Sequence, residues 1–194
     1  LHPYEVYRGY LTDHTVNNAI ACHALNRADL ADRFLQPEFG FIDTDSHIEL
    51  RHTANLILAL ELGDAQWLQY MADAGRAFLA GKRSKISQAI VALLLGVVEG
   101  DPAAVSEQLE AVGKNYKKSH IPWCALTLLG LYNLAGKYLR PDVHAAIAKP
   151  GNPAWFEEFE ALGRSVPENE ALARPFIVFP PELGFMNDRM RELE

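Results

Sequence analysis

The residues with the clearest capacity for chemistry are the histidines, because imidazole binds metal ions and exchanges protons near neutral pH. The chain has seven of them. A zinc site on a helix needs two ligands four residues apart, whereas His47 and His52 are five apart, which separates them by about 140° around a helix. Glu49 and His52 have the E-x-x-H spacing of di-iron carboxylate bundles, but those bundles need a second copy that this sequence lacks. We therefore expect no metal ion and no cofactor.

The remaining candidates do not indicate nucleophilic or acid–base catalysis. His23 lies beside Ile20 on an apolar stripe, which is typical of a core or boundary histidine with its hydrogen bonds satisfied. Cys22 and Cys124 lie in apolar helical segments and not at a helix N-terminus among cations, the setting that lowers a thiol pKa. The sequence has no G-x-S-x-G, P-loop or dinucleotide-binding glycine motif. We expect no catalytic residue and no enzyme, and a deep polar cavity around His23 would contradict that expectation.

The carboxylates of Asp43 and Asp45 lie in an expected loop, and those of Glu157, Glu158 and Glu160 are expected to face outward from a helix. Solvation in such places disfavours acid–base work. In the segment 39–45 two phenylalanines precede two aspartates, and aromatic residues beside acids are typical of an interface edge. The alternative is that these aromatic side chains fill one end of the fold, and that the acids only form a solvated surface. The candidate partner-binding residues are Phe39, Phe41, Asp43, Asp45, Glu157, Glu158 and Glu160.

Hydrophobic periodicity predicts helices along most of the chain. The first is expected from about residue 15 to residue 35, with Val16, His23 and Phe34 on its apolar face. Ser46 with Glu49 forms a capping box for the next helix. Further helices are expected at residues 46–62, 64–80, 84–99, 102–116, 122–138, 142–148 and 153–163, followed by an extended segment at 174–181 and a short helix at 187–193.

Two turns of the same sequence indicate a repeated unit. Gly63-Asp64 and Gly100-Asp101 lie 37 residues apart, and in each the glycine can end one helix while the aspartate caps the next. An apolar inner helix, a glycine turn and an amphipathic outer helix form the pattern of stacked helical hairpins, although any antiparallel bundle can give a similar period. We predict an all-α fold of antiparallel helical hairpins, stacked as a compact bundle or a short array like tetratricopeptide repeats. Residues 1–194 are assigned to one domain, with an N-terminal arm at 1–12, a helical-hairpin core at 13–149 and a C-terminal helix and extended capping segment at 150–194.

Composition and charge restrict the class of protein. Apolar residues make up 49% of the chain and charged residues 22%, as in globular proteins. The net charge of -7 disfavours nucleic acid as a partner, because phosphate binding depends on clustered Lys and Arg. The longest apolar run, residues 121–132, is shorter than the roughly 20 residues that cross a bilayer. The chain begins at Leu1 without a signal peptide, so we expect a cytoplasmic protein, or one whose leader has been removed.

The middle of the chain, about residues 50–138, resembles a known family. Residues 58–64 (LALELGD) and 93–102 (LLLGVVEGDP) carry the apolar helix and the Gly-Asp turn in a style similar to the immunity protein 49 family of bacteria. The resemblance implies an all-helical, cytoplasmic protein without catalysis. It also implies that the chain binds a cognate toxin domain and blocks its action, and the acidic balance suits a basic toxin such as a nuclease.

Two other functions remain open at the level of sequence. One is a helical scaffold like the tetratricopeptide proteins, which would bind a peptide or a partner protein in a concave groove lined by inner-helix side chains. The other is a helical enzyme or small-molecule binder with a cavity between its helices. The geometry of the surface and the presence of a cavity distinguish these functions.

Overall fold

The computed structural model describes residues 9–36, 40–42, 48–116, 121–151, 155 and 157–165. Every regular element in this part of the chain is an α-helix, which confirms the predicted all-α class. The helices are α1 Gly9–Ala24, α2 Ala28–Phe34, α3 Ile48–Leu62, α4 Ala65–Leu79, α5 Lys85–Glu99, α6 Pro102–Asn115, α7 Ile121–Tyr138, α8 Pro141–Ala145 and α9 Glu157–Ser165.

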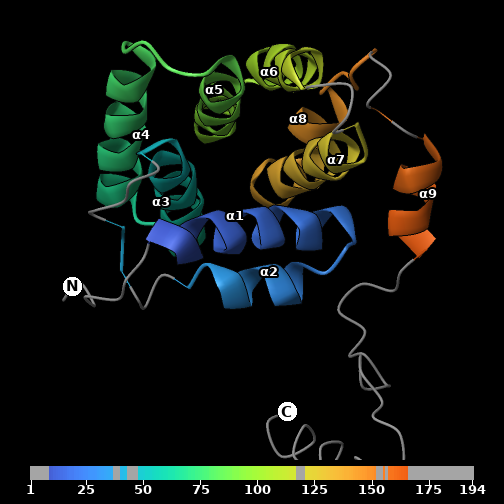
Figure 1. Cartoon of the computed structure of the whole chain (residues 1–194), viewed down its shortest axis with the longest axis horizontal. Coiled ribbons are helices and arrows are strands. Elements are labelled where there is room, and N and C mark those ends of the chain that lie inside the picture. The colour runs from blue at the N-terminus through green and yellow to red at the C-terminus, as the bar shows by residue number, and fades with distance from the viewer. Residues whose placement is uncertain are drawn as a thin grey trace, which may run out of the picture.

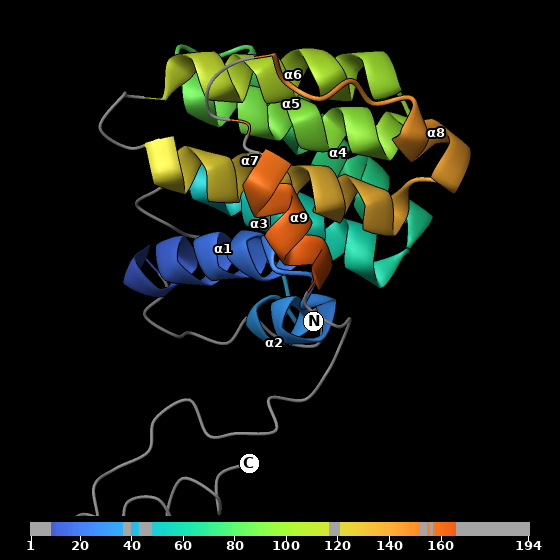
Figure 2. The ribbon, with the colours of Figure 1, turned by 90° about the vertical axis from the view of Figure 1, so that its right-hand side faces the viewer.

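The helices pack against one another as a bundle around α3 and α7. Figure 1 shows these two helices between the α5–α6 pair on one side and the α1–α2 pair on the other. Helix α4 covers the outer side of α3, and α9 lies at the opposite end beside α7 (Figures 1 and 2). The core is made of aliphatic side chains from all of the central helices, among them Leu56 of α3, Leu93 of α5 and Leu131 of α7. Such close packing of aliphatic side chains is the main favourable term in folding.

The turns of the two central hairpins form as local chemistry predicts. Asp64 Oδ1 accepts hydrogen bonds from the backbone N–H groups of Gln66 and Trp67, and Asp101 Oδ1 caps α6 in the same way. Gly63 and Gly100 have φ values of +66° and +67°, a region that favours glycine. These contacts confirm the predicted Gly-Asp turns, and they join α3 to α4 and α5 to α6.

The third hairpin does not continue the array, because α7 packs mainly on α1 and scarcely on α5. Gly130 allows this close approach of two helices. A Cβ placed there would overlap the Ile20 carbonyl oxygen and lie 2.9 Å from the carbonyl carbon. Helix α8, which follows α7, has only five residues. The described chain is therefore a compact bundle with two full hairpins rather than a regular solenoid.

The first predicted helix, residues 15–35, is wrong in its extent, because the chain turns sharply between α1 and α2. Asn26 has a left-handed φ of +57°, and the Arg27 N–H donates to the Cys22 carbonyl, a pattern that ends helices. The turn redirects the chain, so Phe34 does not share the inward face of Val16. Its side chain is 41% exposed, which contradicts its predicted place on the apolar face.

The other predicted boundaries agree with the structure to within a few residues wherever they can be compared. The predicted helix at 142–148 corresponds to α8, and that at 153–163 corresponds to α9. Ser46, the extended segment at 174–181 and the short helix at 187–193 lie outside the described residues. None of the described helices is both long enough and apolar enough to cross a membrane.

Candidate functional site

Three aromatic side chains form a cluster at the surface of α4. The rings of Phe41 and Trp67 are 4.7 Å apart between centroids, and those of Trp67 and Tyr70 are 5.9 Å apart with an edge-to-face geometry. Tyr70 is 64% exposed, a large value for an aromatic side chain. We call Phe41, Trp67 and Tyr70 the aromatic patch. Phe41 and Trp67 are partly buried against the core, and Tyr70 exposes most of its surface to the solvent.

Local structure holds the aromatic patch in place. Trp67 and Tyr70 are three residues apart on α4, so helical geometry places them side by side. Phe41 belongs to the segment before α3, and the buried side chain of Asn55 fixes this segment. The Asn55 amide accepts a hydrogen bond from the Ile42 N–H and donates one to the Ile42 carbonyl, each at 2.8 Å. Asn55 thus pairs with Ile42 as a neighbouring strand would.

Carboxylates lie on both sides of Tyr70 along α4. Asp64 is exposed at the N-terminus of the helix, and Asp73 is one turn after Tyr70. Hydrogen bonds from Gln69 and from Arg76 lower the pKa of Asp73, so it is ionised at neutral pH. The Arg76 guanidinium also contacts Glu99 at 2.7 Å. The border of the aromatic patch on α4 therefore carries more negative than positive charge.

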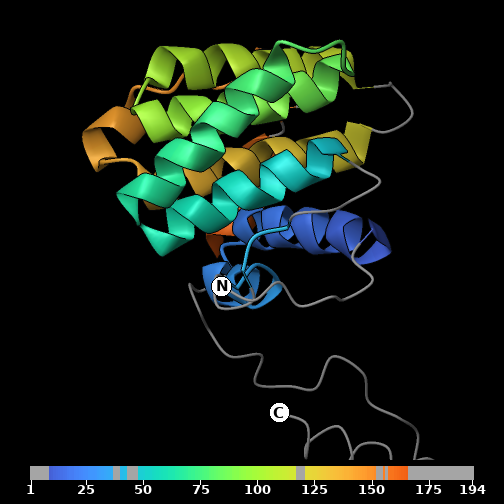
Figure 3. The same cartoon turned by 90° about the vertical axis from the view of Figure 1, so that its left-hand side faces the viewer.

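The structure does not bring the predicted partner-binding residues together. Phe41 belongs to the aromatic patch on α4, whereas Glu157 and Glu158 are exposed on α9. Figures 2 and 3 show α9 and α4 on opposite sides of the bundle. Phe39, Asp43 and Asp45 lie outside the described residues.

The prediction that Glu160 faces outward is wrong. It is only 8% exposed, because α9 turns it toward the bundle, where the Lys149 ammonium donates to both of its oxygens at 2.7 and 2.8 Å. Trp67 and Tyr70 were not among the predicted partner-binding residues. The signal for Tyr70 was present in the sequence, since it is an aromatic residue at a polar position of an otherwise amphipathic helix.

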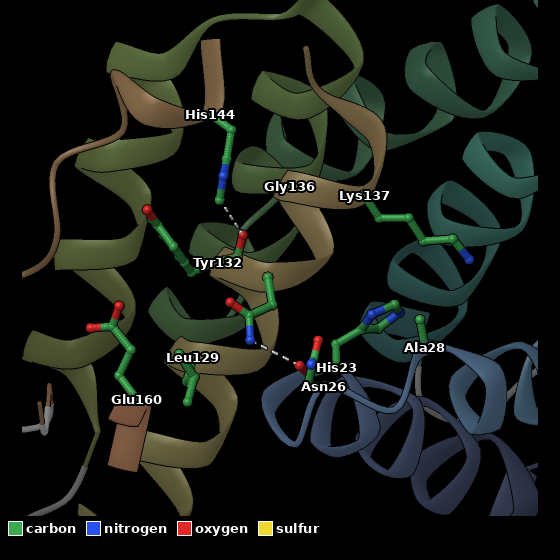
Figure 4. Close-up of a pocket in the computed structure, with 10 residues that line it drawn as sticks. His23, Asn26, Ala28, Leu129, Tyr132, Gly136, Lys137, His144 and Glu160 are labelled. Carbon is green, nitrogen blue, oxygen red and sulfur yellow. Dashed lines mark hydrogen bonds between the residues drawn. The ribbon is translucent and has the colours of Figure 1, made fainter. Parts of the chain in front are cut away.

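A second feature is a half-enclosed pocket of about 550 Å³ next to His23, which we call the His23 pocket. Figure 4 shows it between the end of α1, the start of α2 and one face of α7, with α8 and α9 at its other side. Its lining residues are His23, Asn26, Ala28, Leu129, Tyr132, Asn133, Gly136, Lys137, His144 and Glu160.

His23 is buried as predicted, with 5% exposure, and neither of its ring nitrogens is among the fully enclosed unpaired atoms of the described residues. The backbone carbonyl of His23 accepts a hydrogen bond from the Asn133 amide at 2.9 Å, while its imidazole makes none to the described residues. Burial, and then the nearby Lys137 ammonium, lowers the pKa of His23 to about 4, against the opposing effect of Asp32 and Glu61. The ring is therefore neutral at physiological pH.

The charged groups around the His23 pocket are paired. Lys137 donates to Asp32 at 2.6 Å and to Glu61 at 2.8 Å, and Tyr138 also donates to Glu61. Burial acts to lower the pKa of Lys137, but these carboxylates outweigh it and raise the pKa. The Lys137 ammonium therefore stays charged and links α7 to α2 and α3. His144 Nε2 lies 3.0 Å from the Tyr132 carbonyl oxygen, which attaches α8 to α7.

Two other residues considered for chemistry, His52 and Cys22, have the packing and the pKa shifts of partly buried structural residues. The His52 ring packs on Phe78 at 4.9 Å, and burial lowers its pKa. Burial also raises the pKa of the free Cys22 thiol. Among the described side chains, no three of His, Cys, Asp or Glu lie close enough to hold a metal ion. The His23 pocket, however, is a polar cavity of the kind that would contradict the expectation of no catalysis. The absence of catalysis therefore stays a prediction.

Comparisons with known proteins identified no relative of this chain. No protein-family model, no curated protein and no solved structure matches this chain.

Proposed function

We propose that this chain is a non-catalytic protein-binding module. In this proposal it acts as an immunity protein that binds and neutralises a basic toxin domain through the aromatic patch. The observation that carries the proposal is the exposed Tyr70, which contacts Trp67 edge-on and lies one turn before the ionised Asp73.

The physical argument begins with the exposed aromatic surface. Tyrosine and tryptophan are enriched among the residues that contribute most to protein interfaces, because each buries a large rigid area at little cost in conformational entropy. Trp67 contacts the Tyr70 ring edge-to-face and is itself in contact with Phe41, so a partner would meet a set of rings that restrain one another. An ordered contact surface loses less entropy on binding.

Charge supports a basic partner. The chain has a net charge of -7, and two carboxylates flank the aromatic patch along α4: Asp64, and Asp73, which is paired with Arg76. A negative surface speeds the encounter with a positive protein and disfavours acidic ones. A toxin domain that binds nucleic acid has such a positive surface, which agrees with the resemblance of residues 50–138 to the immunity protein 49 family.

The scaffold function has less support from the described helices. A peptide-binding array would present the side chains of its inner helices along a groove. In α3 and α5 these side chains, such as Leu56 and Leu93, are completely buried in the core. They are therefore not available to line a binding surface.

The test is complex formation with the toxin domain encoded by the adjacent gene. The wild-type chain is expected to bind this domain and to restore growth of cells that express it. Tyr70→Ala is expected to weaken binding by about 10- to 100-fold, equivalent to about 1.4–2.8 kcal/mol, because it removes an interface anchor. Affinity is measured by isothermal titration calorimetry.

Phe34→Ala is the matched control, because Phe34 is also an exposed aromatic side chain but lies on α2 and does not belong to the aromatic patch. It is expected to leave the affinity unchanged. Failure of the wild-type chain to bind or to protect cells would exclude the immunity function. Equal losses in the Tyr70 and Phe34 variants would exclude the aromatic patch as the contact surface.

A further inference from the structure

The His23 pocket is built by residues that are far apart in the sequence. Five of its lining residues lie on one face of α7, at positions 129, 132, 133, 136 and 137, which follow helical spacing. The remainder come from α1, α2, α8 and α9 and the turn at Asn26. A volume of about 550 Å³ is within the usual range of small-molecule sites.

The imidazole of His23 lines the His23 pocket and makes no hydrogen bond to the described residues. Figure 4 shows the ring between Ala28 at the start of α2 and the Lys137 side chain of α7. Because the ring is neutral, it offers one hydrogen-bond donor and one acceptor, and neither is used by the described residues. Among the described residues the ring nitrogens are not fully enclosed unpaired atoms, so they are open to the pocket, where a bound molecule with matching groups can pair with them.

A second unused group lies close to His23. The Asn133 amide nitrogen donates to the His23 backbone carbonyl, but its carboxamide oxygen accepts no hydrogen bond from the described residues. Asn133 also lines the pocket, so its oxygen is a further acceptor on the pocket wall. The lining of the His23 pocket therefore presents one donor and two acceptors from these two residues.

The charges at the His23 pocket select against an ionic ligand. Lys137 is shared by Asp32 and Glu61, and Glu160 is held by Lys149. An anion or a cation that entered would have to compete with these ion pairs of the described residues. Removing a charge from water without a partner is costly. Leu129, Ala28 and the Tyr132 ring provide apolar surface for the rest of a ligand.

We propose that the His23 pocket binds a small uncharged molecule that has a partly apolar body and an amide-like group able to donate and to accept hydrogen bonds. The amide-like group pairs with the His23 imidazole, and the Asn133 oxygen is a further acceptor on the pocket wall. The apolar body lies against Leu129 and Tyr132. This binding is independent of the aromatic patch, which lies on α4.

Three probes of the same shape and different charge test this proposal: benzamide, benzoate and benzamidine, which is a cation at neutral pH. Binding is followed by the ring carbon–proton NMR signals of the histidines at neutral pH. Benzamide is expected to shift the His23 signal saturably at millimolar concentration, and the two charged probes are expected to bind at least tenfold more weakly. Absence of a saturable shift with benzamide, or equal binding of a charged probe, would overturn the proposal.

Variants of the chain locate the binding. His23→Leu removes the donor and the acceptor while keeping a buried side chain of similar size, and it is expected to weaken benzamide binding at least tenfold, as measured from the Tyr132 ring signals. Ala28→Phe keeps His23 but fills part of the His23 pocket, and it is expected to have the same effect. The control is His52→Leu, since His52 packs on Phe78 outside the pocket. Unchanged binding in both pocket variants, or equal loss in the control, would contradict the assignment.

Discussion

The imidazole of His23 is held in a place where protonation is unfavourable. It is buried and close to the Lys137 ammonium, and these two effects lower its pKa to about 4, while Asp32 and Glu61 compensate only in part. An unfolded chain has no such environment, so the same ring protonates near its ordinary pKa of 6.5. Between these two pH values the unfolded state binds more protons than the folded state, and the free energy of unfolding therefore rises with pH.

This difference predicts how stability changes on acidification. The contribution of His23 is fully present above pH 6.5 and is lost as the pH falls toward 4. From about pH 7 to about pH 4.5, the wild-type chain is expected to lose about 2.5 kcal/mol more stability than His23→Leu, which has no proton to bind. Urea unfolding at a series of pH values measures both curves. Parallel curves for the two proteins would show that the folded chain does not resist protonation of this ring.

At the scale of the helices, the contact of α1 with α7 depends on a residue without a side chain. A Cβ at Gly130 would lie 2.6 Å from Cγ2 and 2.9 Å from the carbonyl carbon of Ile20, as well as overlapping the carbonyl oxygen. The obstacle is mainly backbone, which cannot move aside as the end of a flexible side chain can. Gly130→Ala must therefore push α1 away from α7, and this opens the core and the His23 pocket beside it.

Gly130→Ala is expected to destabilise the chain by about 3 kcal/mol or more, as overpacking of a buried contact does. Gly75→Ala is the matched control, because Gly75 is also a buried helical glycine, but its neighbours are side-chain atoms at 3.4–3.5 Å. The control is expected to stay within about 1 kcal/mol of the wild type, since alanine favours the helix. Chemical denaturation gives both values, and similar values for the two variants would contradict a close packing of α1 on α7.

At the scale of the whole molecule, the relevant property is the net charge of -7. In the proposed complex, a charge of this sign acts at a distance on a basic partner and accelerates their encounter, whereas short-range contacts of Tyr70 would determine how long the complex lasts. The two contributions act on different rate constants, so kinetic measurements can separate them.

The association rate constant with a basic toxin domain is therefore expected to fall at least tenfold when the salt concentration rises from about 0.02 M to about 0.5 M. The dissociation rate constant is expected to change by less than about threefold, because the aromatic contacts are not screened by salt. Stopped-flow fluorescence measures both constants. An association rate that does not depend on salt would argue against a basic partner.

Features that depend only on neighbouring residues could be predicted from the sequence. Asp64 and Asp101 cap their helices because each carboxylate reaches backbone N–H groups only two or three residues away. The buried stripe of α4, which includes Met71 and Phe78, follows from helical spacing alone. Asn26 shows the limit of this reasoning, because its left-handed turn divides a segment whose periodicity predicted one helix.

Which distant side chains meet depends on how the helices pack and could not be predicted from the sequence. Lys137 contacts Asp32 and Glu61, and the Asn133 amide reaches the backbone of His23, across separations of 76 to 110 residues. Glu160 was predicted to be solvated and is buried by its contact with Lys149. Periodicity states which face of a helix is apolar, but it does not state which other helix covers that face. The His23 pocket and the aromatic patch therefore depend on how the helices pack together, which periodicity does not predict.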